Sequence, residues 1–350
     1  MNLQQKKTLL LKTSGFLIEF INGRLYGDTY STRLLELIEK APIKNPFFTI
    51  NEVTRAIQSI AFALNEKDID EWFLNYKDDM EKVVNPKKIG VIMAGNIPFV
   101  GWHDMISVIV SGNDFIGKPS SDDADLMPFL ADLMMEFEPS LNGRIHFTER
   151  LNNIDAVIAT GSNNSARYFD YYFGKYPHII RKNRNAVAVI NGFETAEDFK
   201  ELGNDIFQYF GLGCRNVSKL YVPKDYDFNL FFESIEGLHP IINHHKYANN
   251  YDYNRTILLM KQVPFLDNNF MILNEDKSLS SPISVLNYER YENTDKLKEI
   301  INNQKDAIQC IASLNGYYPE SINFGTTQQP KLWDYADGVD TLKFLFELNL

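Results

Sequence analysis

Short apolar runs that alternate with amphipathic segments constrain the fold of this chain more than any other feature. The first run, 89–94, is followed by an apolar helix-like segment at 102–110. Strands of near-continuous apolar character that alternate with helices indicate a mostly parallel sheet covered on both faces. The same alternation predicts strands over 113–117, 144–147 and 154–160, a helix over 123–137, and a helix that opens at 161–164 and runs through Tyr172.

A second α/β section begins near 186–190. Its first helix is predicted over 195–210, with Thr195 as the cap. Further patterns predict strands over 218–222, 270–273, 283–286 and 307–312 and helices over 245–263 and 293–303. The first 80 residues instead predict helices over 31–40, 52–64 and 68–80.

These patterns predict an α/β fold of two lobes. A crevice between two such lobes is a favoured place for a small-molecule site.

Charge and hydropathy exclude several classes of protein. The chain carries 46 acidic and 35 basic residues, a net charge of −11, whereas a nucleic-acid binder needs a basic stripe. Apolar runs such as 106–110 are far shorter than the roughly 20 residues of a membrane span. The N-terminal segment shows no small-residue cleavage site. We therefore expect a chain with no membrane span and no nucleic-acid partner, in the cytoplasm.

Only two cysteines are present, Cys214 and Cys310, and two isolated thiols are most simply reduced. Cys214 lies after a glycine-rich turn and before Arg215, a cation that would favour its thiolate. A small buried hydrophobe is the alternative, and it is the common state of a free cysteine. Cys310 lies inside an apolar strand, where the structural role is favoured.

Three further segments contain candidate site residues at ends of predicted strands. Asn96 offers a carboxamide that can donate to a developing oxyanion, or that satisfies the loop backbone. Gly161 and Ser162 open a helix whose N-terminus suits a phosphate, although a helix cap by Ser162 explains the pattern nearly as well. Lys118 can reach a ribose hydroxyl or a phosphate, or remain a surface lysine.

The segment from His178 to Arg184 is rich in cations. His178, Arg181 and Arg184 form either a solvated turn or a patch for anionic groups of a cofactor or substrate. Six histidines with no H-x-x-x-H pattern and no Cys/His cluster predict no metal site.

In order, these segments resemble the aldehyde dehydrogenase superfamily, and within it the bioluminescence-type (Lux) fatty acyl-CoA reductases. The superfamily's Asn-x-Pro motif matches Asn96–Pro98, and its lysine-proline-serine element matches Lys118–Ser120. Its threonine-glycine-serine turn matches Thr160–Ser162, and its Gly-x-x-Cys nucleophile segment matches Gly211–Cys214. Four motifs in family order make the resemblance fairly specific.

The resemblance implies a role for each of these residues. Cys214 would attack the carbonyl of an acyl-CoA and expel CoA as a product, while Asn96 and the Cys214 backbone N–H hold the oxyanion. Gly161 and Ser162 would sit at the cofactor pyrophosphate, and Lys118 at the adenosine ribose. The nicotinamide would then reduce the thioester, and aldehyde would be released.

Three departures from the superfamily pattern refine this picture. The general-base glutamate motif is replaced by Arg181–Arg184, so the thioester would be poorly hydrolysed. Ser121 stands where NAD-preferring members often carry an acid, which favours NADPH and leaves NADH open because Asp122 and Asp123 follow. The acid of the later Glu-x-Phe-Gly-Pro motif is lost in Ser278–Pro282, which puts the cofactor grip there in doubt.

The resemblance predicts a cofactor domain with N-terminal helices at 1–184, a catalytic thiol domain at 185–325, and a tail at 326–350 that packs back on the body. An acyl-CoA, most simply a fatty one, is the expected substrate. We expect the superfamily's oligomerisation arm to be reduced, which leaves a homo-oligomer or an acyl-activating partner enzyme open. The alternatives are a cysteine acyl-transferase or thioesterase, an aldehyde dehydrogenase in the oxidative direction, and a non-catalytic homologue.

Overall fold

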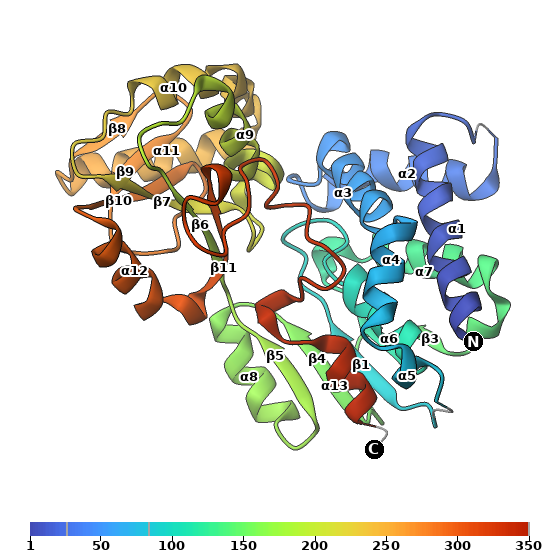
Figure 1. The fold of residues 1–350 in the computed structure, drawn as a ribbon. Coiled ribbons are helices and arrows are strands. Elements are labelled where there is room, and N and C mark those ends of the chain that lie inside the picture. The colour runs from blue at the N-terminus through green and yellow to red at the C-terminus, as the bar shows by residue number, and fades with distance from the viewer. Residues whose placement is uncertain (26, 83–84, 349–350) are drawn as a thin grey trace. The chain divides into compact units, whose positions relative to one another are not determined.

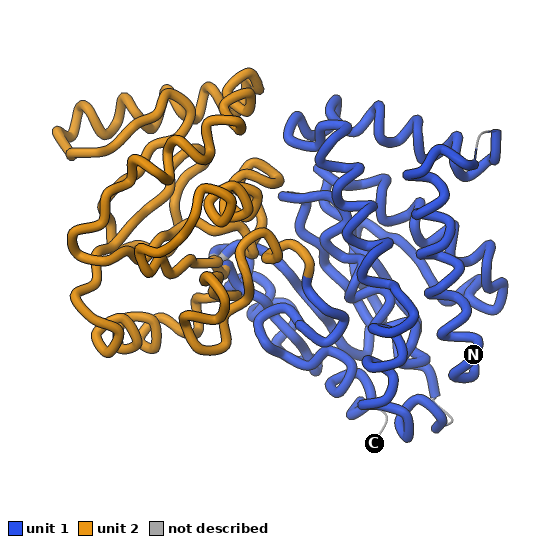
Figure 2. Tube along the Cα trace, turned by 45° about the horizontal axis from the view of Figure 1, so that its top comes forward, with its two compact units in different colours: residues 1–183, 330–350 blue, residues 184–329 orange. Residues whose placement is uncertain are grey.

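The computed structural model describes residues 1–25, 27–82 and 85–348. The chain divides into two compact units (Figure 2), of which unit 1 comprises residues 1–183 and 330–350 and unit 2 residues 184–329. Each unit contains one sheet (Figure 1). The predicted α/β architecture with two lobes is confirmed.

The sheet of unit 1 is parallel throughout, with strand order β3-β2-β1-β4-β5. Its middle strand, β1, is apolar on both faces: Ile89 and Val91 are fully buried on one face, and on the other Gly90 is buried and Ile92 packs with Val157 and Ala159. This pattern explains why the strand needs cover on both sides. The strands are β1 (Lys88–Ile92), β2 (Asp114–Lys118), β3 (Ile145–Phe147), β4 (Ala156–Thr160) and β5 (His178–Arg181).

Helices cover both faces of this sheet. Phe169 of α8 packs with Ala159 on one face, and Arg181 of β5 meets Asp104 of α6 on the other. The N-terminal helices pack on one another and on α7. The helices of unit 1 are α1 (Leu3–Ile21), α2 (Thr29–Lys44), α3 (Ile50–Ala63), α4 (Glu66–Leu74), α5 (Lys77–Met80), α6 (Trp102–Ser111), α7 (Leu126–Phe137), α8 (Asn163–Phe173) and α13 (Thr341–Glu347).

The end of the chain belongs to unit 1. The indole N–H of Trp72 donates to the hydroxyl of Tyr335 (2.7 Å), which in turn donates to Tyr76 (3.1 Å). Lys331 forms an ion pair with the buried carboxylate of Asp68 (2.8 Å). The segment from residue 330 to 348 is therefore held on the helices of unit 1, and residues 349 and 350 of the predicted tail lie outside the described residues.

The sheet of unit 2 has strand order β11-β6-β7-β10-β9-β8 and is parallel except for the edge pair β8–β9. Its helix α9 begins with the predicted cap, since Thr195 and Asp198 form a capping box. The strands are β6 (Asn185–Val189), β7 (Val217–Pro223), β8 (Phe265–Asp267), β9 (Ile272–Glu275), β10 (Val285–Tyr291) and β11 (Ile308–Ser313), and the helices are α9 (Ala196–Phe207), α10 (Asn229–Ile235), α11 (His245–Met260) and α12 (Thr294–Asn303).

The two faces of this sheet carry different helices. Leu297 and Ile301 of α12 pack against Val187 and Tyr221 on one face. On the other face, α9 and α10 pack together through the edge-to-face rings of Phe199 and Phe231. Figure 1 shows α12 on the opposite side of the sheet from α9 and α10.

Two predicted helices are interrupted. The helix predicted over 68–80 breaks between α4 and α5, where the backbone of Tyr76 is non-helical and its hydroxyl donates to Asp340 (2.7 Å). The helix predicted over 195–210 ends as an α-helix at Phe207, because Tyr209 and Phe210 adopt the left-handed conformation. The first break places Tyr76 against Asp340, a contact that the local sequence pattern does not predict.

No helix among the described residues is long and apolar enough to cross a membrane.

The most buried ion pair described in unit 1 joins Arg181 to Asp104. The guanidinium makes two hydrogen bonds to the carboxylate, at 2.6 and 2.8 Å, and a third to the hydroxyl of Thr341 at 3.0 Å. Both charged side chains are 6% exposed. The pair therefore ties β5, α6 and the C-terminal segment together.

Arg181→Ala should lower the free energy of unfolding of unit 1 by about 3–5 kcal/mol, because it leaves the Asp104 carboxylate buried without its counter-charge. All three tryptophans, Trp72, Trp102 and Trp333, lie in unit 1, so their fluorescence in a urea titration reports this unit. His178→Ala, at an exposed position of the same strand, should change stability by no more than about 0.5 kcal/mol. Equal stability of the two variants would contradict the structural role of Arg181.

Candidate active site

The predicted site residues belong to both units. Asn96, Lys118, Gly161 and Ser162 lie in unit 1, and Cys214 lies in unit 2. Each group is described within its own unit.

The unit 1 residues follow three adjacent strands of its sheet. Asn96 follows β1, Lys118 ends β2, and Gly161 follows β4. From β1 the chain continues through β2 to β3 on one side, and from β4 it continues to β5 on the other. The gap between β1 and β4 is thus a topological switch point, and ligands of open parallel sheets bind at the carboxyl ends of such strands.

The loops after β1 and β2 lie against each other. The N–H of Met93 donates to the carbonyl of Lys118 (3.1 Å). A side chain at Gly95 would come within 2.6 Å of the Ser120 hydroxyl, so only glycine allows this approach. The structure therefore brings the Asn-x-Pro and lysine-proline-serine motifs together.

The Asn96 loop is held from both sides. On one side the buried carboxamide of Asn45, at the end of α2, donates to the Gly95 carbonyl (3.2 Å). On the other side the N–H of Phe99 donates to the carboxylate of Asp123 (2.8 Å). Phe99 is 2% exposed and has φ of 60°, a conformation that a bulky residue adopts only when its surroundings impose it. The exposed Asn96 side chain thus stands on a fixed loop.

The sequence does not indicate that Asn45 and Asp123 hold this loop. Asn45 occupies a helix end, where asparagine is common, and Asp123 lies in an acidic run that looks solvated. Their function depends on partners 50 and 24 residues away. Burial raises the pKa of the Asp123 carboxyl to about 6, although the Phe99 N–H opposes this rise.

The junction of β4 and α8 fits a phosphate group. The hydroxyl of Ser162 accepts from the N–H of Ser165 (3.1 Å), as the predicted cap requires. A side chain at Gly161 would lie 2.9 Å from the ring of Phe169, so the turn packs closely on its helix. The N-terminus of α8 also places its positive dipole end at the carboxyl edge of the sheet.

The residues considered for the adenosine ribose, Lys118, Ser121, Asp122 and Asp123, differ in exposure. Lys118 is half-buried, and Ser121 and Asp122 are exposed. Asp123 is 5% exposed and accepts from the Phe99 backbone. The structure therefore removes Asp123 from the residues available to the ribose and leaves Asp122 as the acid beside Ser121.

The predicted cationic patch of His178, Arg181 and Arg184 is not formed as one group. The segment is partly a strand, β5, so His178 and Arg181 differ in exposure. Arg181 is buried and bound to Asp104, which rules it out as a ligand for a mobile anion. Arg184 begins unit 2, where it donates to the Ile308 carbonyl (3.3 Å). His178 stays exposed at the start of its strand.

In unit 2 a sharp change of chain direction precedes Cys214. Tyr209, Phe210 and Gly211 all have positive φ, between 52° and 78°, and end the helical segment. A tight turn over 213–216 follows, closed by the N–H of Asn216 donating to the Gly213 carbonyl (3.0 Å). Cys214 lies in this turn and is exposed, so the alternative that it is a small buried hydrophobe does not hold. Cys310, on the edge strand β11, is partly buried.

Buried polar groups hold the Cys214 turn to its surroundings. Asn216 is 2% exposed and bonds to Gly213 and to the end of α9. Arg215 donates to the carbonyl of Thr327 (3.2 Å). Asp205 accepts from the N–H and the hydroxyl of Thr327, at 3.0 and 2.7 Å. Burial raises the pKa of Asp205 to about 6, against these hydrogen bonds.

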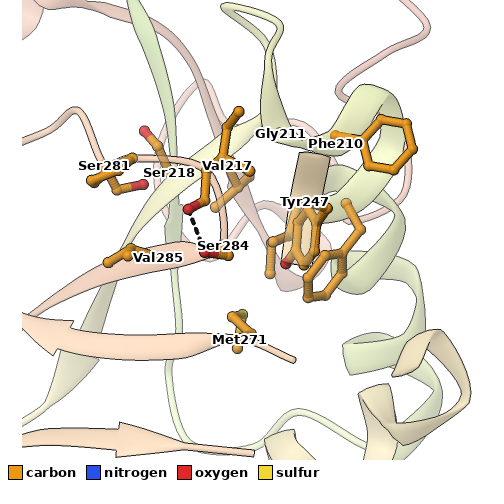
Figure 3. A pocket seen from close by; sticks show the side chains of 13 residues that line it. Phe210, Gly211, Val217, Ser218, Tyr247, Met271, Ser281, Ser284 and Val285 are labelled. Atoms are coloured by element: carbon orange, nitrogen blue, oxygen red, sulfur yellow. Dashed lines mark hydrogen bonds between the residues drawn. The ribbon is translucent and has the colours of Figure 1, made fainter. Parts of the chain in front are cut away.

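A narrow cavity of about 20 Å³ lies beside the turn, with room for about one water molecule. Figure 3 shows Phe210 and Tyr247 on one side of it and Ser281, Ser284 and Val285 on the other. Gly211 and Val217, which flank the Cys214 turn, also line it. This cavity is too small for a fatty chain.

A cavity of about 600 Å³ lies at the other end of the same sheet. It is lined by the segments that follow β6, β7 and β10. Since β7 has seven residues, this cavity is roughly 20 Å along the strand from the Cys214 turn. Its charged residues are Glu194, Asp225, Asp227, Glu292 and a single cation, Lys224, which disfavours phosphates.

The Ser278–Pro282 segment is ordered by β10. The carboxamide of Asn287 donates to the carbonyls of Ser278 and Ser280, both at 3.1 Å. No carboxylate occurs in this segment, as the sequence indicated. In the described part of the chain, no group of three or more His, Cys, Asp or Glu side chains is arranged to hold a metal ion.

Comparison with known proteins places these residues in a wider context. The model of the acyl-CoA reductase (LuxC) family matches residues 27–231. No curated protein matches the chain. Aldehyde dehydrogenase 21 from Physcomitrella patens, in complex with the reaction product succinate, has a TM-score of 0.67 and 14% identity over 100% of this chain and 85% of its own.

Two other solved structures give the same result. The NAD-dependent aldehyde dehydrogenase from Sinorhizobium meliloti has a TM-score of 0.62 and 14% identity, and covers 94% of this chain and 72% of its own. The NAD+ complex of an aldehyde dehydrogenase from Bacillus cereus has a TM-score of 0.59 and 12% identity, and the match covers 89% of this chain and 72% of that one. At these identities the neighbours show the fold, and the predicted aldehyde dehydrogenase-like fold is confirmed.

The raised pKa of Asp123 predicts a pH-dependent stability difference. The folded state holds the Asp123 proton more tightly than the unfolded state, so stability from this group is lost as pH rises from about 4 through about 6. Asp123→Asn does not titrate, so its free energy of unfolding relative to the parent should rise by about 2–3 kcal/mol over this range.

Urea titrations followed by tryptophan fluorescence, at about pH 4.5 and at about pH 7.5, measure the difference in free energy of unfolding between the variant and the parent in unit 1. Asp122→Asn, at the exposed neighbouring position, is the control, and its difference from the parent should be the same at both pH values. Equal behaviour of the two variants would contradict a buried, ionisable Asp123.

Proposed function

Since the chain belongs to the acyl-CoA reductase (LuxC) family, whose model matches more than half of it, we propose that it reduces an acyl-CoA to an aldehyde through a thioester on Cys214. It is an oxidoreductase of the aldehyde dehydrogenase and LuxC type. The matched range contains Cys214, Asn96, Lys118, Gly161 and Ser162. The observation that carries the proposal is the exposed Cys214 thiol in its hydrogen-bonded turn.

The thiol of Cys214 is the nucleophile in this proposal. Its sulfur attacks the carbonyl carbon of the acyl-CoA, the carbonyl oxygen becomes an oxyanion, and the bond to the CoA sulfur then breaks. The Asn96 carboxamide and the Cys214 backbone N–H donate hydrogen bonds to that oxygen. CoA leaves as the thiol, and the acyl group remains on the enzyme as a thioester.

The segment that replaces the superfamily's general-base motif favours survival of this thioester. The superfamily's general-base glutamate motif is replaced by Arg181–Arg184, so this segment supplies no carboxylate to activate water. Arg181 is itself locked onto Asp104. These features support reduction of acyl-CoA over oxidation of an aldehyde to an acid, and over a thioesterase. A thiol nucleophile also fits a reducing compartment such as the cytoplasm.

The carboxyl edge of the unit 1 sheet is where we propose a nicotinamide dinucleotide binds. The N-terminus of α8 with Gly161 and Ser162 would hold the pyrophosphate, and Lys118 the adenosine ribose. When bound, the nicotinamide supplies the hydride that reduces the thioester. Ser121 accommodates a 2′-phosphate better than an acid would, so we propose NADPH as the preferred cofactor, with Asp122 as the residue that opposes it.

The first prediction from this proposal concerns the two cysteines. Intact mass after mixing with a long-chain acyl-CoA should show an acyl adduct, which Cys214→Ser abolishes and Cys310→Ser retains. Addition of NADPH should discharge the adduct and release aldehyde, more rapidly than addition of NADH. Free acid without loss of NADPH would instead support a thioesterase, and an adduct that depends on Cys310 would overturn the assignment.

The second prediction concerns the oxyanion. Asn96→Ala should raise the barrier to acylation by about 2–4 kcal/mol, because one preorganised donor is lost. Single-turnover acylation kinetics measure this change. Ile97→Ala, in the same loop, is the control for disturbance of the backbone and should have a much smaller effect. A rate loss below about tenfold, or 1.4 kcal/mol, would make Asn96 a loop residue only.

A further inference from the structure

We infer that Asn216 is the positioning residue of the nucleophile: it fixes the turn that carries Cys214 and so sets the direction of the Cys214 backbone N–H. This inference rests on the proposed role of Cys214. It adds a residue whose side chain acts through the backbone and does not need to touch the substrate.

The Asn216 carboxamide makes three hydrogen bonds while 2% exposed. Its oxygen accepts from the N–H of Gly213 at 2.8 Å. Its nitrogen donates to the carbonyl of Gln208 at 2.7 Å and to that of Asp205 at 3.0 Å. One side chain therefore connects the start of the Cys214 turn with the C-terminal end of α9.

The turn is closed twice between the same two residues. The backbone N–H of Asn216 donates to the Gly213 carbonyl (3.0 Å), and the side chain of Asn216 accepts from the Gly213 N–H. Cys214 and Arg215 are the central residues of the turn. Since both ends are fixed, the peptide plane between Gly213 and Cys214 has little freedom to rotate.

Asparagine is the residue that this position requires. Aspartate would place a second carboxylate oxygen, which cannot donate, against the carbonyls of Gln208 and Asp205. Serine could make only some of the three hydrogen bonds. Alanine would leave the Gly213 N–H and the carbonyls of Gln208 and Asp205 without this buried or part-buried partner, and the loss of such a partner is costly. Of these carbonyls, that of Asp205 lies in the last turn of α9, where carbonyls lack partners within the helix, and that of Gln208 belongs to the residue that caps the helix.

A second set of contacts holds the same turn from its other side. Arg215 donates to the Thr327 carbonyl, and Thr327 is bound through its N–H and hydroxyl to the Asp205 carboxylate. The Asp205 carbonyl in turn accepts from Asn216. The turn, the end of α9 and the segment around Thr327 thus form a closed ring of hydrogen bonds within unit 2.

Two reactions of the same thiol distinguish positioning from a general structural role. Attack on an acyl-CoA develops an oxyanion that needs the Cys214 N–H, whereas alkylation by iodoacetamide displaces iodide and develops none. Asn216→Ala should therefore slow acylation by about tenfold or more. It should slow alkylation by no more than about threefold, because the thiol itself remains exposed.

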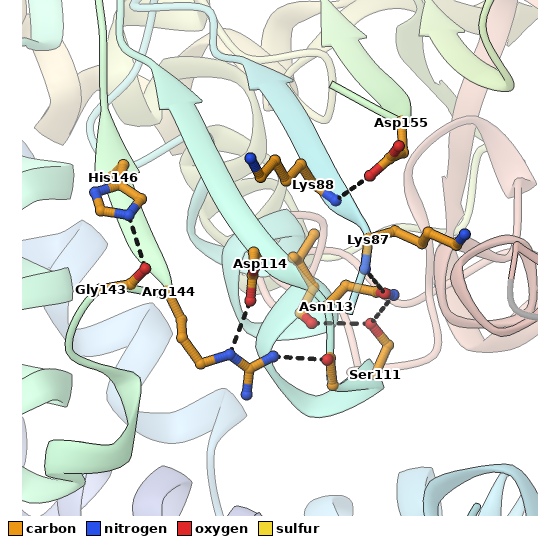
Figure 4. Close-up of polar contacts among 11 residues, drawn as sticks. Lys87, Lys88, Ser111, Asn113, Asp114, Gly143, Arg144, His146 and Asp155 are labelled. Carbon is orange, nitrogen blue, oxygen red and sulfur yellow. Dashed lines mark hydrogen bonds and ion pairs between the residues drawn. The ribbon is translucent and has the colours of Figure 1, made fainter. Parts of the chain in front are cut away.

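The matched control is Asn113→Ala in unit 1. Asn113 is also 2% exposed; its oxygen accepts from the Lys87 N–H (3.0 Å) and its nitrogen donates to Ser111 (2.9 Å) and to the Leu345 carbonyl (3.4 Å). Figure 4 shows the Lys87 and Ser111 contacts at the start of β2. This variant removes a similarly buried carboxamide from the unit that does not contain the thiol, so acylation and alkylation should both stay within about twofold of the parent.

The outcomes separate failure of this inference from failure of the proposed function. Acylation of Asn216→Ala at the parent rate, or equal losses in both reactions, would overturn the inference while the function stands. Acylation that survives Cys214→Ser would overturn both. If Asn216→Ala does not fold, Asn216→Ser, which retains a hydroxyl at this position, replaces it and should show the same selective loss of acylation with a smaller magnitude.

Discussion

The parallel pairing of buried strands is the constraint from which the arrangement of unit 1 follows. Successive parallel strands need crossover connections, so the loops that leave their carboxyl ends gather at one edge of the sheet. Asn96, Lys118 and Gly161 are distant in sequence, yet each follows or ends one of three neighbouring strands. The apolar strands therefore supply the spatial grouping, and the loops supply the chemistry.

Buried polar side chains then fix how these loops run. Asp123 holds the strained backbone of Phe99, Arg181 and Asp104 fasten the C-terminal segment, and Asn216 closes the Cys214 turn. An apolar contact tolerates small shifts, whereas a buried hydrogen bond is lost when its partner moves. Because a buried hydrogen bond depends on direction and distance, buried polar side chains are suited to holding a loop in one conformation.

The sequence predicted the elements that rest on local patterns and missed those that rest on distant partners. The strands near 89–94 and 154–160 were found because their apolar runs are continuous. The sequence predicts no strand at β5, whose cations indicate either a solvated turn or an anion-binding patch, because nothing nearby indicates that Arg181 is buried against Asp104, 77 positions earlier. Cys214 was predicted from its motif. The contact of Asn216 with α9, in contrast, depends on the left-handed backbone conformation of Tyr209, which the residue types in this segment do not predict.

The position of Cys214 explains why its turn needs such an anchor. Open parallel sheets place their ligands at the carboxyl ends of strands, and in unit 2 that end holds an acidic cavity, whereas Cys214 precedes the amino end of β7. The segments that lead into β7 and β10 meet at that end and leave a cavity of only about 20 Å³ beside the turn. The carboxamide of Asn216, bound to both the turn and the end of α9, fixes the orientation of this turn.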